Sequence, residues 1–262
     1  MCRIIKRLTA GIPLMAALLL TACGEGAGDR LPMLQATAHR LVPLTKETES
    51  PKCEVSLKVD YVAGNDAVAK AINNAIGERL FYLTGLSMQE MTDSFANQYV
   101  RNYVKDFGPL YREDRTDSTR CAWYEYRYTL TTETRQELPK RLTYIINLDY
   151  YEGGAHGISQ QLVMNFNTEN GERLTLGDML TEGYEQRLQP LLLKALMEKV
   201  KAGSEEQLRE MGYLTAMDIF VPENFILQDD GITFIYNPYE IAPYAMGRTE
   251  LTLDYGELGA KE

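Results

Sequence analysis

Apolar and polar side chains alternate with a period of two in four segments of the chain, the pattern of a β-strand that buries one face. These segments cover residues 54–61, 121–130, 142–150 and 158–166. Turn residues at Leu138-Pro139 and at Gly153-Gly154 separate the last three segments. Because strands joined by short turns pair most simply with their neighbours, the pattern predicts an antiparallel meander.

Three other segments carry apolar residues at helical spacing. They cover residues 68–83, 88–107 and 188–200. Gly85 separates the first two helices, and the third ends near Gly203. Pro190 is expected to lie in the first turns of the third helix or to kink it. The methionine and aromatic side chains of residues 88–107 are expected to form a core face, not a cofactor site.

The C-terminal part of the chain predicts a hairpin and a last strand. Asp230-Gly231 is a strong turn signal between apolar runs at residues 225–227 and 232–235, and residues 251–255 resemble a strand. The whole pattern predicts an α+β fold, in which an antiparallel sheet (a meander plus a C-terminal hairpin) packs with about three helices. The sequence has no internal repeat or second linker, so we expect one compact unit.

The first 22 residues have the layout of an export signal. A basic start is followed by an apolar run over residues 8–20 and then by small residues before Cys23. The run is shorter than the ~20 residues that a membrane-spanning helix needs. Leu20-Thr21-Ala22-Cys23 resembles the bacterial lipobox, which implies cleavage before Cys23 and lipidation, palmitate included, of that cysteine. The alternative is an ordinary secretory signal with a chance cysteine.

A lipidated Cys23 predicts an extracytoplasmic lipoprotein of the cell envelope, held on the outer membrane or a periplasmic face through its lipid anchor. Residues 23–50 are rich in small, polar and proline residues with little periodicity, so we expect a flexible tether in which His39 is solvated. Removing residues 1–22 takes away three of the 27 basic residues and none of the 37 acidic ones, which leaves a net charge of −13. That charge argues against nucleic acid as a partner and could attract a cationic protein.

Two cysteines remain in the part expected to fold, Cys53 and Cys121. Disulfides persist outside the cytoplasm, so a Cys53–Cys121 bridge is one hypothesis. The other is two isolated small apolar residues in strands. Because His156 is the only histidine in the part expected to fold and no zinc-type spacing occurs, we expect no metal site and no cofactor.

Several motifs in the second half resemble a known family. They are Tyr150-Tyr151-Glu152-Gly153-Gly154-Ala155-His156, the run from Leu174 to Leu180, Asp230-Gly231-Ile232-Thr233-Phe234, and the run from Tyr236 to Ala245. In this order they resemble the domain of unknown function 3298, also called the RsiV-like C-terminal domain, which we place at residues 138–258. Residues 51–137 are similar to the PdaC-type N-terminal domain that often precedes it.

The resemblance implies a fold and a location more than an activity. Relatives with known roles carry this pair of domains outside the membrane, in an anti-sigma factor that senses lysozyme and in a peptidoglycan deacetylase with a separate catalytic domain. This sequence lacks both the sigma-binding segment and the deacetylase domain. The resemblance therefore suggests recognition of a peptidoglycan fragment or of a lysozyme-like protein.

Five aromatic side chains are candidates for a ligand-contacting surface: Trp123, Tyr151, His156, Tyr239 and Tyr244. Tyrosine in a loop on a rigid scaffold supplies contact area at little entropic cost. In the plainer interpretation the tyrosines pack back onto the sheet, the glycines before His156 supply a tight turn, and His156 bonds a neighbouring backbone group.

Catalysis has weaker support in the sequence. No serine lies in a nucleophile elbow, and no glycine loop could cradle phosphate. A glycosidase would have to use a pair such as Glu152 and Asp178, and Asp178 is more simply a helix cap. We therefore expect a non-catalytic binding or sensing module. The alternatives are an enzyme that modifies envelope glycan through Glu152, His156 or Asp178, and a structural lipoprotein without a soluble ligand.

Overall fold

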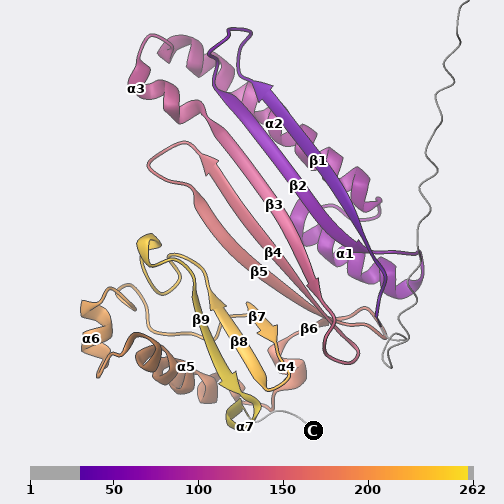
Figure 1. The fold of residues 1–262 in the computed structure, drawn as a ribbon, viewed down its shortest axis with the longest axis vertical. Coiled ribbons are helices and arrows are strands. Elements are labelled where there is room, and N and C mark those ends of the chain that lie inside the picture. Colours follow the sequence, from indigo (N-terminus) through magenta and orange to yellow (C-terminus); the bar gives the residue numbers. More distant parts are fainter. Residues whose placement is uncertain (1–29, 259–262) are drawn as a thin grey trace, which may run out of the picture.

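The computed structural model of the protein describes residues 30–258, apart from the side chains of residues 118, 119 and 122. Two β-sheets and the helices packed on them make up this part of the chain (Figure 1). The larger sheet has six strands in the order β1-β2-β3-β4-β5-β6, and the smaller has three in the order β7-β8-β9. The α+β class and the mostly antiparallel pairing expected from the sequence are confirmed.

The larger sheet begins with a strand that the sequence pattern did not reveal. β1 (Met33–Pro43) pairs antiparallel with β2 (Lys52–Val62) along its whole length, from Met33↔Val62 to Pro43↔Lys52. The flexible tether expected over residues 23–50 is therefore wrong for residues 33–43. His39, expected to be a solvated linker residue, lies in β1 with its imidazole 3.2 Å from the Glu54 carboxylate.

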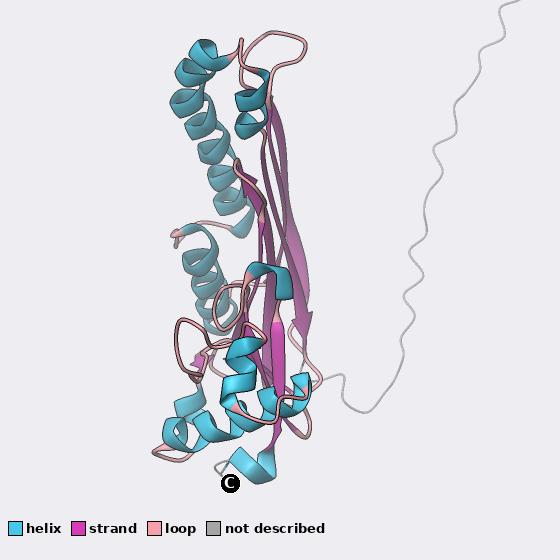
Figure 2. Ribbon diagram, turned by 90° about the vertical axis from the view of Figure 1, so that its left-hand side faces the viewer, coloured by secondary structure: helices cyan, strands magenta, loops and turns pink. Residues whose placement is uncertain are grey.

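Two long helices lie in the connection from β2 to β3 (Tyr126–Arg135), and these two strands pair in parallel. They are α1 (Ala67–Phe81), capped by Asp66, and α2 (Met88–Asp114), which begins with a capping box between Ser87 and Glu90. A Cβ at Gly77 would lie 2.4 Å from the Met91 sulfur, so the absence of a side chain there lets the two helices approach closely. Figure 2 shows these helices as a layer along one face of the larger sheet.

The predicted meander is confirmed. β3, β4 (Arg141–Glu152) and β5 (Ile158–Asn167) are antiparallel neighbours, and a two-residue strand β6 (Arg173–Leu174) ends the sheet. The strand expected from Cys121 starts later, because residues 118–124 form a short α-helix, α3 (Ser118–Cys121), and a 3₁₀ turn, η1 (Ala122–Tyr124). Cys121 therefore lies in α3, not in a strand.

Aromatic side chains fill the space between α2 and β3. Phe95 and Tyr99 of α2 lie 5.2 and 5.0 Å from the ring of Tyr128, and Tyr103 and Phe107 lie 5.2 and 4.9 Å from the ring of Tyr126. Burial raises the pKa of Tyr128 to about 12, so this phenol stays protonated at physiological pH. The α2 stripe is a core face, as its spacing predicts.

The smaller sheet has a core of its own. β7 (Phe225–Leu227), β8 (Gly231–Tyr236) and β9 (Thr249–Asp254) pack against α5 (Tyr184–Val200), with the shorter helices around them. The predicted C-terminal hairpin and third long helix are confirmed, and Pro190 lies in the second turn of α5. The shorter elements are α4 (Leu176–Met179), α6 (Glu205–Glu210), η2 (Tyr244–Met246) and α7 (Tyr255–Leu258).

The two sheets meet through a small apolar cluster formed by Ile145 and Val163 of the larger sheet with Ile226 and Ile235 of the smaller. β4 is buried on both faces in its first half, at residues 142–146, because its alternate residues face the helices and the smaller sheet. The core between the larger sheet and its helices includes residues up to Phe166, and the core of the smaller sheet begins at Leu176. The division between the cores thus follows β5, whereas the halves expected from the family resemblance divide at 137/138, inside the larger sheet.

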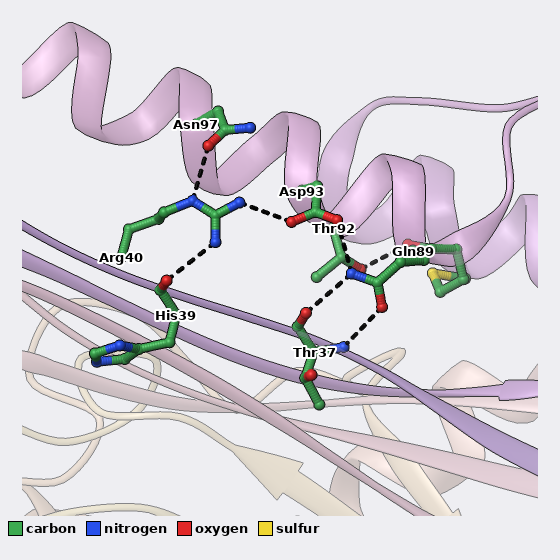
Figure 3. A network of polar contacts seen from close by, with 8 residues as sticks. Thr37, His39, Arg40, Gln89, Thr92, Asp93 and Asn97 are labelled. Carbon is green, nitrogen blue, oxygen red and sulfur yellow. Dashed lines mark hydrogen bonds and ion pairs between the residues drawn. The ribbon is translucent and has the colours of Figure 1, made fainter.

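Side chains from α2 cover the free edge of β1 (Figure 3). The Gln89 amide accepts a hydrogen bond from the Thr37 N–H (3.2 Å) and donates one to the Thr37 carbonyl (3.0 Å). Arg40 donates to the His39 carbonyl and to Asp93, which also accepts from Gln89. These contacts occupy three backbone groups near the middle of β1, the N–H and carbonyl of Thr37 and the carbonyl of His39, which an edge strand otherwise offers to another strand.

No helix within residues 30–258 combines the length and the apolar character needed to cross a membrane.

Candidate functional site

Three of the predicted ligand-contacting residues meet in one aromatic stack. The imidazole of His156 lies 4.2 Å from the ring of Tyr244, with the two planes 12° apart, and 6.3 Å from the ring of Tyr239. Tyr239 and Tyr244 are 5.9 Å apart. His156 comes from the β4–β5 turn, whereas both tyrosines come from the segment between β8 and β9. Tyr239 is 59% exposed, so the stack is open to solvent.

The β4–β5 turn is built so that His156 reaches this position. Gly153 and Gly154 have φ angles of 82° and 93°, a conformation that glycine adopts without strain. A Cβ at Gly153 would lie 2.5 Å from the carbonyl oxygen of Trp123, so only glycine allows the turn to approach that residue. The Tyr151 hydroxyl donates to the Gly154 carbonyl at 2.9 Å and fixes the turn from the other side.

The hydrogen bonds of His156 define its tautomer. Its Nδ1 lies 3.0 Å from the Gly157 carbonyl oxygen, which can only accept, so Nδ1 carries the proton. In the neutral imidazole Nε2 is then an acceptor, and the Tyr239 hydroxyl, 3.1 Å away, donates to it. The expected bond from His156 to a neighbouring backbone group is thus present, together with a contact to Tyr239 that the sequence did not suggest.

The segment that carries Tyr239 is anchored to β5 through Asn237. The Asn237 amide accepts from the Gln161 N–H (2.7 Å) and donates to the Gln161 carbonyl (3.1 Å), as a neighbouring strand would. Glu240 accepts from the Asn237 N–H, and burial raises the pKa of this carboxyl. Tyr236 is fully buried and donates to the Phe220 carbonyl. The motif therefore divides into buried anchors and the exposed Tyr239.

A shallow apolar groove of about 220 Å³ adjoins the stack. Tyr239 lines it together with residues 214–217 and residues 240–243. Met217 on its rim is 51% exposed. This groove was missed at the sequence level, because residues 211–218 show no periodicity and their proximity to Tyr239 arises only from the fold. The hydrogen bond from the Leu214 N–H to the Ile241 carbonyl, 2.8 Å long, joins its two walls.

The other two predicted aromatic residues lie beside the stack and not in it. Trp123 is 60% exposed in η1, and its backbone packs against Gly153. Tyr151 lies at the end of β4. Among the described residues, neither ring makes a ring contact with His156, Tyr239 or Tyr244. The five predicted residues thus lie around the β4–β5 turn, and three of them touch.

The fold separates Glu152 from Asp178. Glu152 ends β4, where its carboxylate accepts a hydrogen bond from the Tyr99 hydroxyl. Asp178 caps α4 by accepting from the Thr175 N–H and hydroxyl, at 2.7 Å each. Its neighbour Met179 contacts Arg141 at the opposite end of β4. A strand of 12 residues spans about 35 Å, whereas paired glycosidase carboxylates lie within roughly 10 Å.

Both cysteines of the described chain are free thiols, so the hypothesis of a Cys53–Cys121 disulfide is not supported. Cys53 is fully buried in β2, where burial raises its pKa to about 12. Cys121 lies in α3, with its sulfur 3.9 Å from the Arg115 carbonyl oxygen. The expected lipidation site Cys23 lies outside the described residues. Within residues 30–258, no cluster of three or more His, Cys, Asp or Glu side chains is arranged to hold a metal ion.

Comparison with known proteins finds relatives that carry no assigned function. Residues 177–256 match the family described as "Protein of unknown function (DUF3298)". A solved structure of a DUF3298 family member from Bacteroides fragilis is 31% identical, with a TM-score of 0.82, and the match covers 88% of this chain and 94% of that one. A DUF3298 protein from Pseudomonas aeruginosa shares the fold at 19% identity, with a TM-score of 0.60 and coverage of 89% and 95%. No curated protein matches the chain.

Proposed function

The chain belongs to the DUF3298 family, and we propose that it is a non-catalytic binding or sensing module for a cell-envelope ligand. The observation that carries the proposal is the solvent-open stack of His156, Tyr239 and Tyr244. The His156 ring is held by the Gly157 carbonyl, by the Tyr239 hydroxyl and by its stacking on Tyr244, so little conformational entropy is lost when a ligand covers the stack.

A glycan fragment, such as a piece of peptidoglycan, is the ligand that suits this stack best. A pyranose ring has an apolar face of C–H groups and a polar rim of hydroxyls. Aromatic faces would cover the first, and the oxygen of the Tyr239 hydroxyl, whose hydrogen goes to His156, would accept a hydrogen bond from the second. The adjoining apolar groove, at about 220 Å³, is smaller than most complete ligand sites and would take one substituent of such a fragment.

A lysozyme-like protein is the second candidate ligand, and the charge of the chain favours it. The processed chain would carry 37 acidic against 24 basic side chains, which attracts a cationic partner. Attraction between exposed charges is screened over ~8 Å at physiological ionic strength. This form of the proposal therefore requires binding that weakens as salt is added.

The proposed setting is the outside of a membrane. We propose that residues 1–22 are removed as a signal peptide and that Cys23 is lipidated, which places the folded part on the outer membrane or a periplasmic face. In the same proposal residues 138–258 act as an RsiV-like domain and residues 51–137 as a PdaC-type domain. The motifs from Tyr150 to His156 and from Tyr236 to Ala245 support the assignment of residues 138–258, and the same motifs contribute the residues of the stack.

Two alternative functions have less support than a binding module. A glycan-modifying enzyme would need Glu152 or Asp178 beside a bound sugar, and the first bonds Tyr99 while the second caps α4 about one strand length away. His156 alone would be the base, and its acceptor nitrogen faces Tyr239. A structural lipoprotein would leave the exposed stack without a role.

Calorimetric titration with soluble peptidoglycan fragments and with c-type lysozyme, at low and at physiological salt, tests the proposal. Saturable binding of the fragments at both salt concentrations supports glycan recognition. Lysozyme binding that weakens with salt supports the second candidate. Failure of both ligands to bind contradicts the proposed function, and steady release of cleaved or deacetylated glycan during the titration contradicts its non-catalytic form.

A further inference from the structure

A second cavity, of about 420 Å³, lies far from the aromatic stack. It opens where the β3–β4 turn faces the β7–β8 turn, at the end of the larger sheet that carries β6 (Figure 1). Its volume falls in the range of sites that hold a small molecule. The lining is predominantly polar and consists of Arg135, Glu137, Leu138, Arg141, Thr143, Leu227, Gln228, Asp229 and Asp230.

The two arginines of the cavity have N–H groups that are not paired with a carboxylate of the described chain. Arg141 is half-buried, and its Nη1 donates to the Met179 sulfur at 3.0 Å, which is a weak acceptor. Within the described part of the chain, neither Arg135 nor Arg141 pairs with a carboxylate within 4.0 Å. A guanidinium binds a carboxylate through two parallel N–H groups, so this wall of the cavity suits a carboxylate ligand.

The facing wall carries the opposite charge on a fixed turn. Asp229 and Asp230 lie between β7 and β8, where the Gln228 N–H bonds the Gly231 carbonyl at 3.0 Å. Tyr255 holds this turn from behind, through its hydroxyl to the Gln228 carbonyl and through its N–H to the Asp230 carbonyl. The aspartates are therefore presented by a supported backbone, and both are exposed.

Charges of both signs line the cavity without closing it. If the walls touched, the arginines and aspartates would pair across it, yet no such pair is present among the described residues. Arg135 and Arg141 would attract a simple anion, but Glu137, Asp229 and Asp230 would repel it. For a simple cation the attraction and the repulsion are exchanged. A molecule that carries both charges gains from both walls.

We propose that this cavity binds a small zwitterion, namely a free amino acid or a short peptide, with the carboxylate at Arg135 and Arg141 and the ammonium at Asp229 and Asp230. The proposal is independent of the aromatic stack. β8 runs from the turn at Gly231 to Tyr236, just before Tyr239, so the two sites lie at opposite ends of the smaller sheet.

Titration of the protein with alanylalanine tests this proposal, with two blocked forms of the same dipeptide as matched probes. Free alanylalanine is expected to bind saturably, with a Kd at or below about 1 mM. The affinity of glycine, compared with that of alanylalanine, shows whether the cavity prefers a free amino acid or a peptide. The C-terminal amide and the N-acetyl form are each expected to bind about tenfold more weakly. Equal binding of either blocked form, tighter binding of inorganic phosphate, or no saturable binding of alanylalanine overturns the proposal.

Variants assign the binding to this cavity. Arg141→Gln is expected to weaken alanylalanine about tenfold, with partial recovery in Arg141→Lys, and Asp230→Asn is expected to weaken the free dipeptide but not its N-acetyl form. If thermal unfolding shows that Arg141→Gln is destabilised, Arg135→Gln replaces it in the binding experiment, because the Arg135 side chain is exposed. Arg127→Gln, at the other end of β3, is the matched control. Wild-type affinity in Arg141→Gln and Arg135→Gln overturns the assignment.

Discussion

The side-chain amide of Asn237 pairs with the backbone of Gln161 through two hydrogen bonds, of 2.7 and 3.1 Å, and in this way continues the larger sheet beyond β5. The same arrangement recurs where Gln89 pairs with Thr37 on the edge of β1. Each amide presents one donor and one acceptor, as a peptide group does, so it can satisfy a strand edge without offering a further edge. One amide lies on β1, the outer strand at one side of the larger sheet, and the other lies on the part of β5 that β6 does not pair.

Replacing Asn237 with alanine should destabilise the protein by about 1–3 kcal/mol, because the Gln161 N–H loses its partner in a partly buried position, whereas the Gln161 carbonyl keeps its hydrogen bond from the Asn224 amide. Chemical denaturation measures the loss. Asn102→Ala, which removes an exposed amide on α2, is the control and should cost less than about 0.5 kcal/mol. Equal losses of unfolding free energy in the two variants would show that the pairing with Gln161 does not stabilise the protein more than an exposed amide does.

Gln89→Ala should make the protein self-associate. Without the amide, the Thr37 N–H and carbonyl on the edge of β1 become available to a second chain. Sedimentation velocity over a range of protein concentrations is the measurement. Gln98→Ala, on the exposed side of the same helix, should stay monomeric at concentrations where Gln89→Ala forms dimers or larger species. A monomeric Gln89→Ala would mean that Arg40 or the twist of β1 protects the edge by itself.

Stability at acid pH should depend on Asp93. Hydrogen bonds from Gln89 and Arg40 hold the pKa of this carboxyl below its ordinary value. The unfolded chain therefore binds a proton at a higher pH than the folded chain does, and this part of the stability is present above the ordinary pKa and is lost as pH falls through the folded pKa. The unfolding free energy, measured from pH 6 to pH 3, should fall less steeply in Asp93→Asn than in the wild type. Asp106→Asn, on the same helix, should follow the wild type.

Thiol titration should distinguish the two cysteines. In a chain that starts at residue 24, Cys53 and Cys121 are the only thiols. Cys121 is partly exposed and should react in the folded protein, whereas Cys53 is fully buried with its pKa raised to about 12 and should react only after unfolding. Two thiols should be counted after unfolding without reductant. A count of zero would restore the disulfide hypothesis.

Much of the fold follows from periodicity, and the exceptions have physical causes. β3, β4 and β5 carry large apolar residues at alternate positions, and the capping residues before α1 and α2 agree with the helical spacing that follows them. β1 was missed because the buried residues at its centre are Ala36 and Ala38, which give almost no contrast with polar neighbours. The parallel pairing of β2 with β3 depends on where two helices pack, which no local pattern encodes.

The candidate site could be predicted only in part. Loop tyrosines and a histidine after two glycines were visible in the sequence, yet His156 and Tyr239 are 83 positions apart and meet because Asn237 anchors one loop to the strand that follows the other. The role of Glu240 as an acceptor for the Asn237 N–H has no sequence signal. The cavity with Arg135 and Arg141 also arises from tertiary structure, because its walls come from two separate hairpins.

The measurement that tests the central claim most directly is the affinity of soluble peptidoglycan fragments for wild type, Tyr239→Ala and Tyr82→Ala, determined by calorimetry at physiological salt. Tyr82 is 88% exposed at the end of α1 and serves as the matched control for loss of an exposed tyrosine. Removal of the Tyr239 ring should weaken binding about tenfold or more, because an exposed aromatic anchor is lost, while Tyr82→Ala binds as the wild type does. Equal affinity in all three proteins, or no binding to the wild type, would contradict the assignment of the His156–Tyr239–Tyr244 stack as a glycan-binding site.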